Sequence, residues 1–136
     1  MNELVIVRGP SGFGKSTYVT KNFTPKGFIH FEADMFFIKN GEYRFDRTKL
    51  GAAHMWCQGM VRKSLELGAN VVVSNTSTTL KELSDYIKIA KDCTVAFRVI
   101  RLAKQFKNIH SVPDVVVENM ITRFQDYPGE TILTDY

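Results

Sequence analysis

Residues 8–17, RGPSGFGKST, have the types and spacing most suited to chemistry in this chain. The stretch Gly9–Ser16 satisfies the pattern GxxxxGK[ST], and the apolar run Leu4–Val7 comes directly before it. Glycines allow successive backbone N–H groups to point inward around an anion, and a helix beginning at Lys15 adds the positive end of its dipole. The pattern therefore predicts a loop that binds the phosphates of a nucleotide.

Two side chains of this loop have individual roles in the prediction. The ammonium group of Lys15 is expected to reach the β- and γ-phosphates, and the hydroxyl of Ser16 is expected to hold Mg²⁺. The predicted cofactors are therefore ATP and Mg²⁺. The cofactor-binding residues are Gly9, Pro10, Ser11, Gly12, Phe13, Gly14, Lys15, Ser16 and Thr17.

A carboxylate further along the chain is a candidate for the acceptor side of the reaction. ATPases and GTPases usually place an Asp at the end of a later strand to hold Mg²⁺, but here the corresponding stretch ends in Ser74 and Asn75. The stretch FEADMFF instead supplies Asp34 just after a predicted strand. A carboxylate there can accept the proton of an attacking hydroxyl, so we predict that Asp34 is the catalytic base. Glu32 competes for that role, and a simple turn cap is the structural alternative for Asp34.

Alternating patterns predict the scaffold that positions these residues. Four apolar runs predict buried strands, and amphipathic stretches between them predict helices. The expected strands are 4–7, 27–31, 70–75 and 93–102, and the expected helices begin near Lys15, Asp46, Thr79 and Ser111. This alternation predicts an α/β domain with a parallel sheet of about four strands, in the order 2-3-1-4, and helices on both faces. Ligands of such sheets bind at the carboxyl ends of the strands, where Asp34 and the loop are both expected.

The composition of the 136 residues, 44% hydrophobic and 24% charged, is typical of a soluble globular domain. No apolar stretch approaches the roughly 20 residues of a membrane span. Cys57 and Cys93 lack metal-type spacing and are interpreted as reduced core residues without a disulfide partner. We expect one cytoplasmic domain over residues 1–136. The net charge is +4, with one basic and five acidic side chains in residues 111–136, so the remainder is basic enough to attract a polyanion or nucleotide.

Five motifs in order resemble the P-loop polynucleotide kinase family and the related small AAA-type kinase domains. They are GPSGFGKST, FEADMFF, YRFDRTKLGAAHMWCQ, VVVSNTST and NIHSVPDVVVENM, and the resemblance covers residues 3–124. It implies an adenylate-kinase-like fold and transfer of the ATP γ-phosphate to a hydroxyl, typically the 5′-OH of a nucleic acid. It also matches Lys15 and Ser16 to the phosphate and Mg²⁺ residues, and Asp34 to the general base.

The sequence departs from the family pattern beside the predicted base. Members commonly carry an Arg three residues after the catalytic Asp, where this chain has Phe37, and a second Asp where it has Met35. The missing Arg favours an alternative acceptor, a small molecule such as a nucleoside, a sugar or a hydroxylated base. Phe36 and Phe37 are candidates for stacking on a nucleobase, with membership of the core as the alternative.

Further acceptor-site candidates lie in two other places. Arg44 is flanked by aromatic residues and could provide a phosphate contact beside a stacking face, or the cluster could simply anchor a solvent-exposed loop. Asn75 and Thr76 end the third predicted strand and could bind acceptor or phosphate, or could simply cap the strand. His54, in the long predicted helix, is interpreted as a core histidine.

Basic residues follow the fourth predicted strand. Arg101, Lys104, Lys107 and His110 are four basic or titratable side chains within ten residues. Kinases of this fold usually close a lid here, about residues 103–112, whose cations offset charge on the transferring phosphoryl group. The alternative is an ordinary solvated basic surface. The last predicted helix has an apolar face of Val116, Val117, Met120, Ile121 and Phe124. The tail, residues 127–136, lies beyond the resemblance and is assigned no role.

Three functions remain from the sequence. The favoured one is an ATP-dependent kinase whose acceptor is the 5′-OH end of DNA or RNA, so that its partners are a nucleoside triphosphate and a nucleic-acid end. The second is a small-molecule kinase of the same fold. The third is an ATP-binding or ATPase module without phosphate transfer to an acceptor, which the missing strand-end Asp disfavours.

Overall fold

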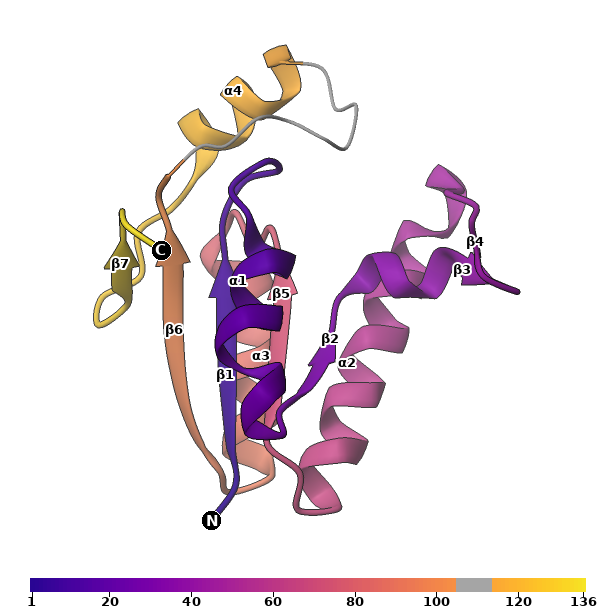
Figure 1. Ribbon diagram of the computed structural model, residues 1–136, viewed down its shortest axis with the longest axis vertical. Helices are drawn as coiled ribbons and strands as arrows, with labels where there is room; N and C mark the ends of the chain where they lie inside the picture. The colour runs from indigo at the N-terminus through magenta and orange to yellow at the C-terminus, as the bar shows by residue number, and fades with distance from the viewer. Residues whose placement is uncertain (105–113) are drawn as a thin grey trace.

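A five-stranded parallel sheet forms the centre of the molecule (Figure 1). The computed structural model describes residues 1–104 and 114–136. The strand order is β2-β5-β1-β6-β7, where the strands are β1 (Glu3–Arg8), β2 (Ile29–Phe31), β5 (Val71–Asn75), β6 (Ala96–Leu102) and β7 (Thr131–Leu133). The predicted α/β class and the order of the four expected strands are confirmed. The fifth strand was not expected.

Helices cover the sheet on both faces, as Figure 1 shows for α1 in front and α3 behind. Helices α2 (Leu50–Glu66) and α3 (Leu80–Asp92) cover one face, where Leu4 and Ile6 of β1 belong to one buried cluster with residues of both helices. Helix α1 (Lys15–Asn22) covers the other, where Val19 packs with Val5 and Val7. Alternate residues of β1 therefore point to two separate cores, which explains its unbroken apolar sequence.

Short elements connect the helices and strands. In chain order they are η1 (Thr24–Lys26), η2 (Ala33–Phe37), β3 (Ile38–Lys39), β4 (Glu42–Tyr43) and η3 (Arg47–Lys49). The side chain of Asp46 accepts a hydrogen bond from Thr48 N, so the predicted helix start there is occupied by η3, and α2 follows it. Helix α3 follows Thr79 as expected, and Thr79 caps it, because Thr79 Oγ1 accepts from Glu82 N at 3.2 Å.

The tail forms the fifth strand. Strand β7 pairs with β6 at the sheet edge, with Ile100 opposite Thr131 and Leu102 opposite Leu133. The hydrogen bond from Ala103 N to Leu133 O, 2.8 Å, extends this pairing. The prediction of about four strands was incomplete because a three-residue edge strand carries little pattern of its own.

Helix α4 (Asp114–Arg123) lies beyond the carboxyl ends of the strands (Figure 1). Its predicted start at Ser111 lies outside the described residues. The predicted apolar face is only partly covered, since Val116 and Ile121 are 37% and 42% exposed. Within the described part of the chain, no helix is both long enough and apolar enough to cross a membrane.

Candidate active site

The GxxxxGK[ST] stretch forms a tight turn between β1 and α1. Gly9 lies so close to β6 that an added Cβ would meet Leu102 O at 3.2 Å. Gly14 immediately precedes α1 in the left-handed conformation, with φ of 75°, which glycine adopts without steric cost. The helix therefore begins at Lys15 as predicted, and its free N–H groups are available for an anion at the loop.

The side chain of Lys15 folds back into this turn. Its Nζ donates to Gly9 O at 2.8 Å and to Pro10 O at 3.2 Å. Burial lowers the pKa of Lys15 to about 8, and the negative charges of Glu32 and Asp34 partly oppose that shift. The structure therefore places the ammonium group inside the loop, under the electrostatic influence of both candidate carboxylates.

Glu32 joins the end of β2 to the loop. Its Oε2 accepts hydrogen bonds from Ser16 Oγ at 3.0 Å and from Ser74 Oγ at 3.2 Å. His30 Nε2 lies 2.5 Å from Ser74 Oγ, and burial lowers the pKa of His30, so the ring is neutral at neutral pH. Because Ser74 donates its proton to Glu32, the network assigns the proton of His30 to Nε2. A polar chain therefore runs from β2 through β5 to the hydroxyl of Ser16.

Asp34 has different surroundings from Glu32. It lies in the first turn of η2, is exposed, and accepts a hydrogen bond from the Tyr43 hydroxyl at 3.4 Å. Burial and the neighbouring Asp34 charge raise the pKa of Tyr43, so the phenol keeps its proton. Asp34 therefore has one oxygen next to a donor while its side chain remains accessible.

Asn75 and Thr76 hold neighbouring segments at the carboxyl edge of the sheet. Asn75 Oδ1 accepts from Ala33 N at 2.8 Å, and its Nδ2 donates to the Tyr86 hydroxyl at 3.1 Å. Thr76 O accepts from Gly9 N at 3.3 Å. The amide of Asn75 thus fixes the start of η2, where Asp34 lies. This is the structural alternative to acceptor binding.

A protein family described as AAA domain matches residues 4–125. The chain belongs to this AAA domain family. The matched residues include the loop, both carboxylates and Asn75, and they stop before the tail. The AAA-type part of the resemblance seen in the sequence is confirmed, whereas its polynucleotide kinase part stays a prediction.

The sequences of two relatives align with most of this AAA domain. One is the uncharacterized protein PM0531 of Pasteurella multocida, 30% identical over 142 residues, which cover 94% of this chain and 79% of the relative. The other is human NEDD4-binding protein 2, 28% identical over 144 residues, which cover 96% of this chain. The alignment spans only 8% of that human protein.

Solved structures share the fold of the AAA domain. A chain of the Pnkp1/Rnl/Hen1 RNA repair complex superposes with a TM-score of 0.74 at 17% identity, over 91% of this chain and 44% of the other. For the Mycobacterium tuberculosis APS kinase CysC, the TM-score is 0.70 at 16% identity, over 98% and 88%. For a gluconokinase from Sinorhizobium meliloti, it is 0.68 at 14% identity, over 97% and 82%. The AAA domain therefore has a P-loop kinase-like fold.

Of the two interpretations offered for Phe37, the structure supports membership of the core and not stacking on a base. Its side chain is 3% exposed, and its ring centre lies 5.2 Å from that of Phe45 and 6.3 Å from that of Tyr43. Phe36 is partly buried and packs 6.1 Å from Trp56. Phe37 belongs to the core, whereas Tyr43 and Phe45 are 55% and 53% exposed.

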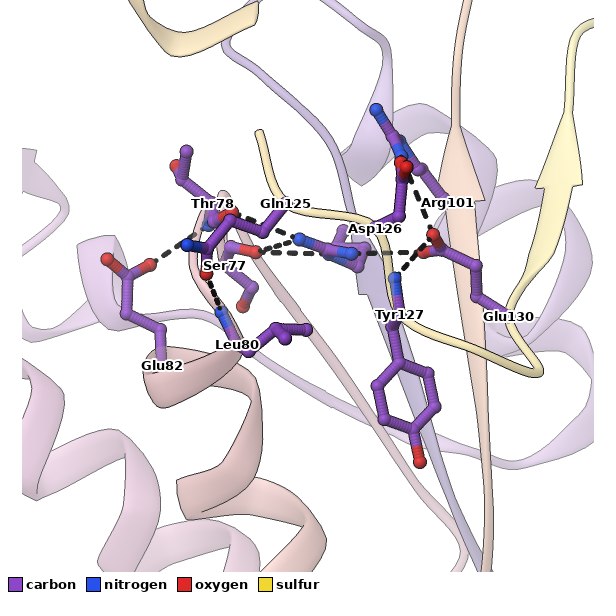
Figure 2. Close-up of polar contacts among 10 residues, drawn as sticks. Ser77, Thr78, Leu80, Glu82, Arg101, Gln125, Asp126, Tyr127 and Glu130 are labelled. Carbon is purple, nitrogen blue, oxygen red and sulfur yellow. Dashed lines mark hydrogen bonds and ion pairs between the residues drawn. The ribbon is translucent and has the colours of Figure 1, made fainter. Parts of the chain in front are cut away.

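Arg101 is paired internally rather than free to act as a lid cation. Its Nη1 donates to Asp126 at 2.5 Å and approaches Glu130 at 3.5 Å, as Figure 2 shows. The guanidinium also lies over the ring of Phe124, 4.5 Å from its centre. These acidic partners come from the C-terminal part of the chain, and the predicted phosphate role of Arg101 did not take them into account.

The other basic residues that were predicted to bind phosphate differ in their surroundings. Arg44 is exposed and pairs with Glu42 at 2.6 Å. Lys104 is exposed, and its backbone N–H donates to the Tyr136 hydroxyl at 3.1 Å. Lys107 and His110 lie outside the described residues. The lid at 103–112 therefore stays a prediction.

Sequence reasoning missed Arg8, a fully buried cation at the end of β1. Its Nε and Nη2 donate to Ser77 O at 3.0 and 2.8 Å, and Nη2 also donates to Thr78 O at 3.2 Å. Its Nη1 pairs with Glu130 at 3.0 Å. An arginine ending an otherwise buried strand is a signal that a buried partner is needed, although the sequence alone does not identify that partner.

Proposed function

We propose that this AAA domain is a kinase that transfers the γ-phosphate of ATP to a hydroxyl, with the 5′-OH end of DNA or RNA as the favoured acceptor. The observation that carries the proposal is the contrast between two carboxylates near the loop. Glu32 accepts a hydrogen bond from Ser16, the predicted magnesium ligand, whereas Asp34 is exposed. This contrast supports a division of roles, in which Glu32 holds a cation and Asp34 takes the proton of an incoming hydroxyl.

The residues around Ser16 suit magnesium. Ser16 Oγ and Glu32 Oε2 are 3.0 Å apart. Two ligands at adjacent corners of an octahedron, each about 2.0–2.1 Å from Mg²⁺, lie roughly 2.9 Å apart. Both oxygens would therefore fit one ion, and Glu32 would provide the carboxylate that other P-loop proteins take from the later strand. When bound, Mg²⁺ neutralises charge on the β- and γ-phosphates.

The remaining residues supply the chemistry of transfer. Backbone N–H groups of the loop and the ammonium of Lys15 hold the triphosphate, and Asp34 accepts the proton of the attacking hydroxyl. The acceptor oxygen bonds to the γ-phosphorus while the bond to the β–γ bridging oxygen breaks, leaving ADP. The hydrogen bond from Tyr43 to Asp34 Oδ1 orients the carboxylate and leaves Oδ2 for the proton. Lys104, Lys107 and His110 remain candidates for cations that close over the phosphates.

Exposed aromatic rings next to Asp34 support a nucleic-acid acceptor. Tyr43 contacts Asp34 directly, and Phe45 lies two residues further on. Both rings are more than half exposed. The same exposed stretch includes Arg44 and Arg47. Exposed rings with neighbouring cations bind single strands through base stacking and phosphate contacts.

A small-molecule acceptor is supported by a different observation. Phe37 fills the core where the family resemblance expects the phosphate-binding Arg. A cavity of about 200 Å³ lies at the carboxyl end of β5 between α2 and α3. It is lined by His54, Gln58, Asn75, Ser77, Glu82, Asp85 and Tyr86. Among the residues that the structure describes, no lysine or arginine lines it, so it suits a neutral hydroxylated acceptor better than a phosphate. His54 is exposed at this cavity, so its interpretation as a core histidine is wrong.

One labelling experiment tests these functions. The protein is incubated with Mg²⁺ and ATP labelled at the γ-phosphate, together with 5′-OH and 5′-phosphate oligonucleotides, nucleosides and sugars. Label on the 5′-OH oligonucleotide, but not on its 5′-phosphate counterpart, supports the favoured acceptor. Label on a nucleoside or sugar alone supports the small-molecule kinase. Release of labelled phosphate to water, with no labelled acceptor in the panel, contradicts the kinase and supports the ATPase module.

A further inference from the structure

The tail contacts the base of the phosphate-binding loop through Glu130. This carboxylate is 3% exposed and pairs with Arg8, the residue directly before Gly9. Its Oε2 also accepts from Tyr127 N at 2.9 Å, and Figure 2 shows it between Tyr127 and Arg101. Because Arg8 is fully buried, Glu130 compensates a charge that has no access to water.

The tail reaches the far side of the same loop through Tyr136. Its hydroxyl lies 2.7 Å from Phe13 O, to which it donates, and 2.8 Å from Lys104 O. The Tyr136 ring packs edge-on against Tyr18 of α1, with ring centres 5.7 Å apart. Burial raises the pKa of Tyr136, so the hydroxyl remains a donor at neutral pH. The tail therefore touches the chain at the residue before the loop and at a residue within it.

We propose that the tail, residues 127–136, braces the phosphate-binding loop for the triphosphate, with Glu130 and Tyr136 as positioning residues. The inference rests on the proposed function, because it takes the ligand of the loop to be a nucleotide. The family match ends at residue 125, so Glu130 and Tyr136 lie outside the matched range, whereas Arg8 and Phe13, which they contact, lie inside it. It gives the tail, which the sequence left without a role, a part in nucleotide binding.

The physical basis is preorganisation. A glycine-rich loop has many accessible backbone conformations, and binding a ligand in one of them costs conformational entropy. Arg8 fixes the strand end that leads into the loop, and the Tyr136 hydroxyl fixes the Phe13 carbonyl near the other end. With both ends held, less entropy remains to be lost when the loop N–H groups close around phosphate oxygens.

The test compares affinities for a phosphate ligand and for a nucleoside. Calorimetric titrations use ATP, inorganic tripolyphosphate and adenosine as probes. Tyr136→Phe removes the hydroxyl and keeps the ring. We expect it to bind ATP and tripolyphosphate about three- to tenfold more weakly, as for the loss of one hydrogen bond, with adenosine affinity unchanged. Asp135→Asn is the matched control, since Asp135 is an exposed neighbour, and its affinities should match the wild type.

Glu130→Gln tests the second contact. It keeps the shape of the side chain but leaves Arg8 uncompensated, so we expect a lower melting temperature and a larger loss of tripolyphosphate affinity than in Tyr136→Phe. If Glu130→Gln does not fold, Tyr136→Phe decides. Wild-type affinity for tripolyphosphate in a folded Tyr136→Phe protein overturns the brace and leaves the proposed function standing. A wild-type protein that binds neither ATP nor tripolyphosphate overturns both.

Discussion

Ser16 Oγ and Glu32 Oε2 lie 3.0 Å apart, although 16 residues separate them in the chain. This contact joins the start of α1 to the end of β2, two segments that are neighbours only because the sheet aligns its carboxyl ends. Ser74, at the end of β5, donates to the same carboxylate oxygen. The later strand therefore contributes a hydroxyl that holds Glu32, where many P-loop proteins have an Asp that helps to hold magnesium.

Replacing Glu32 with Gln should weaken magnesium-dependent nucleotide binding. The amide keeps a hydrogen-bond acceptor for Ser16 but removes the negative charge that favours the cation. We expect the affinity for ATP with Mg²⁺ to fall about 10- to 100-fold, as for other groups that support a metal site. The affinity for ATP in EDTA should change little. Titration calorimetry under both conditions measures the difference. An equal loss with and without Mg²⁺ would show that Glu32 acts on the loop and not through the ion.

Replacing Asp34 with Asn should remove the base and preserve the nucleotide site. We expect kcat for phosphate transfer to fall by ~10²–10⁴, which is the usual contribution of general base catalysis. ATP affinity should stay close to the wild-type value, because Asp34→Asn leaves Glu32 and the loop in place. Asp92→Asn is a matched control at the far end of α3, where Asp92 pairs with Arg62. Full transfer activity in Asp34→Asn would exclude Asp34 as the base.

Local sequence signals predicted the parts of the fold that are determined locally. The run Leu4–Val7, the glycine-rich turn and the cap at Thr79 each carry their own pattern, and each forms where it was expected. Strand β7 carries no such pattern, because it depends on hydrogen bonds that β6 provides. Three residues, Thr131–Leu133, are too few to predict a strand unless the neighbouring strand β6 is known.

The residues that the sequence did not place depend on partners that local patterns do not reveal. Arg101 resembles a phosphate ligand by charge and position, but Asp126 and Glu130 neutralise it from the end of the chain. Arg8 and its partner Glu130 are 122 residues apart. Adjacent phenylalanines look alike in a sequence whether they are buried or exposed, and the ring of Phe37 packs against those of Tyr43 and Phe45, which follow it in the chain. In each case the position of the side chain depends on tertiary contacts that no local sequence pattern encodes.

The pKa of Lys15 predicts a pH dependence of nucleotide binding. Burial lowers this pKa to about 8 in the free protein, and a bound triphosphate favours the charged ammonium and raises it. Affinity for ATP should therefore be level below about pH 7.5 and should fall as the pH rises through the free-protein pKa, because binding then requires proton uptake. Calorimetric titration from about pH 7 to about pH 9.5 measures the slope. Lys15→Arg stays charged throughout and should lose the slope, so an equal decline in that variant would contradict the assignment to Lys15.

The exposed aromatic rings distinguish the two kinase functions. If a nucleic-acid end binds beside Asp34, Phe45→Ala should raise KM for a 5′-OH oligonucleotide roughly five- to 150-fold, since stacking contributes about 1–3 kcal/mol per base. The KM for ATP should be unchanged, because Phe45 lies on the acceptor side. Leu67→Ala removes another exposed apolar side chain, just past the end of α2, and provides the control. Steady-state kinetics with saturating ATP measure both variants, and the same assay repeated at several salt concentrations should show a steep negative salt dependence for a polyanionic acceptor. An unchanged KM in Phe45→Ala together with a flat salt dependence would contradict the nucleic-acid acceptor and favour a neutral small molecule in the cavity between α2 and α3.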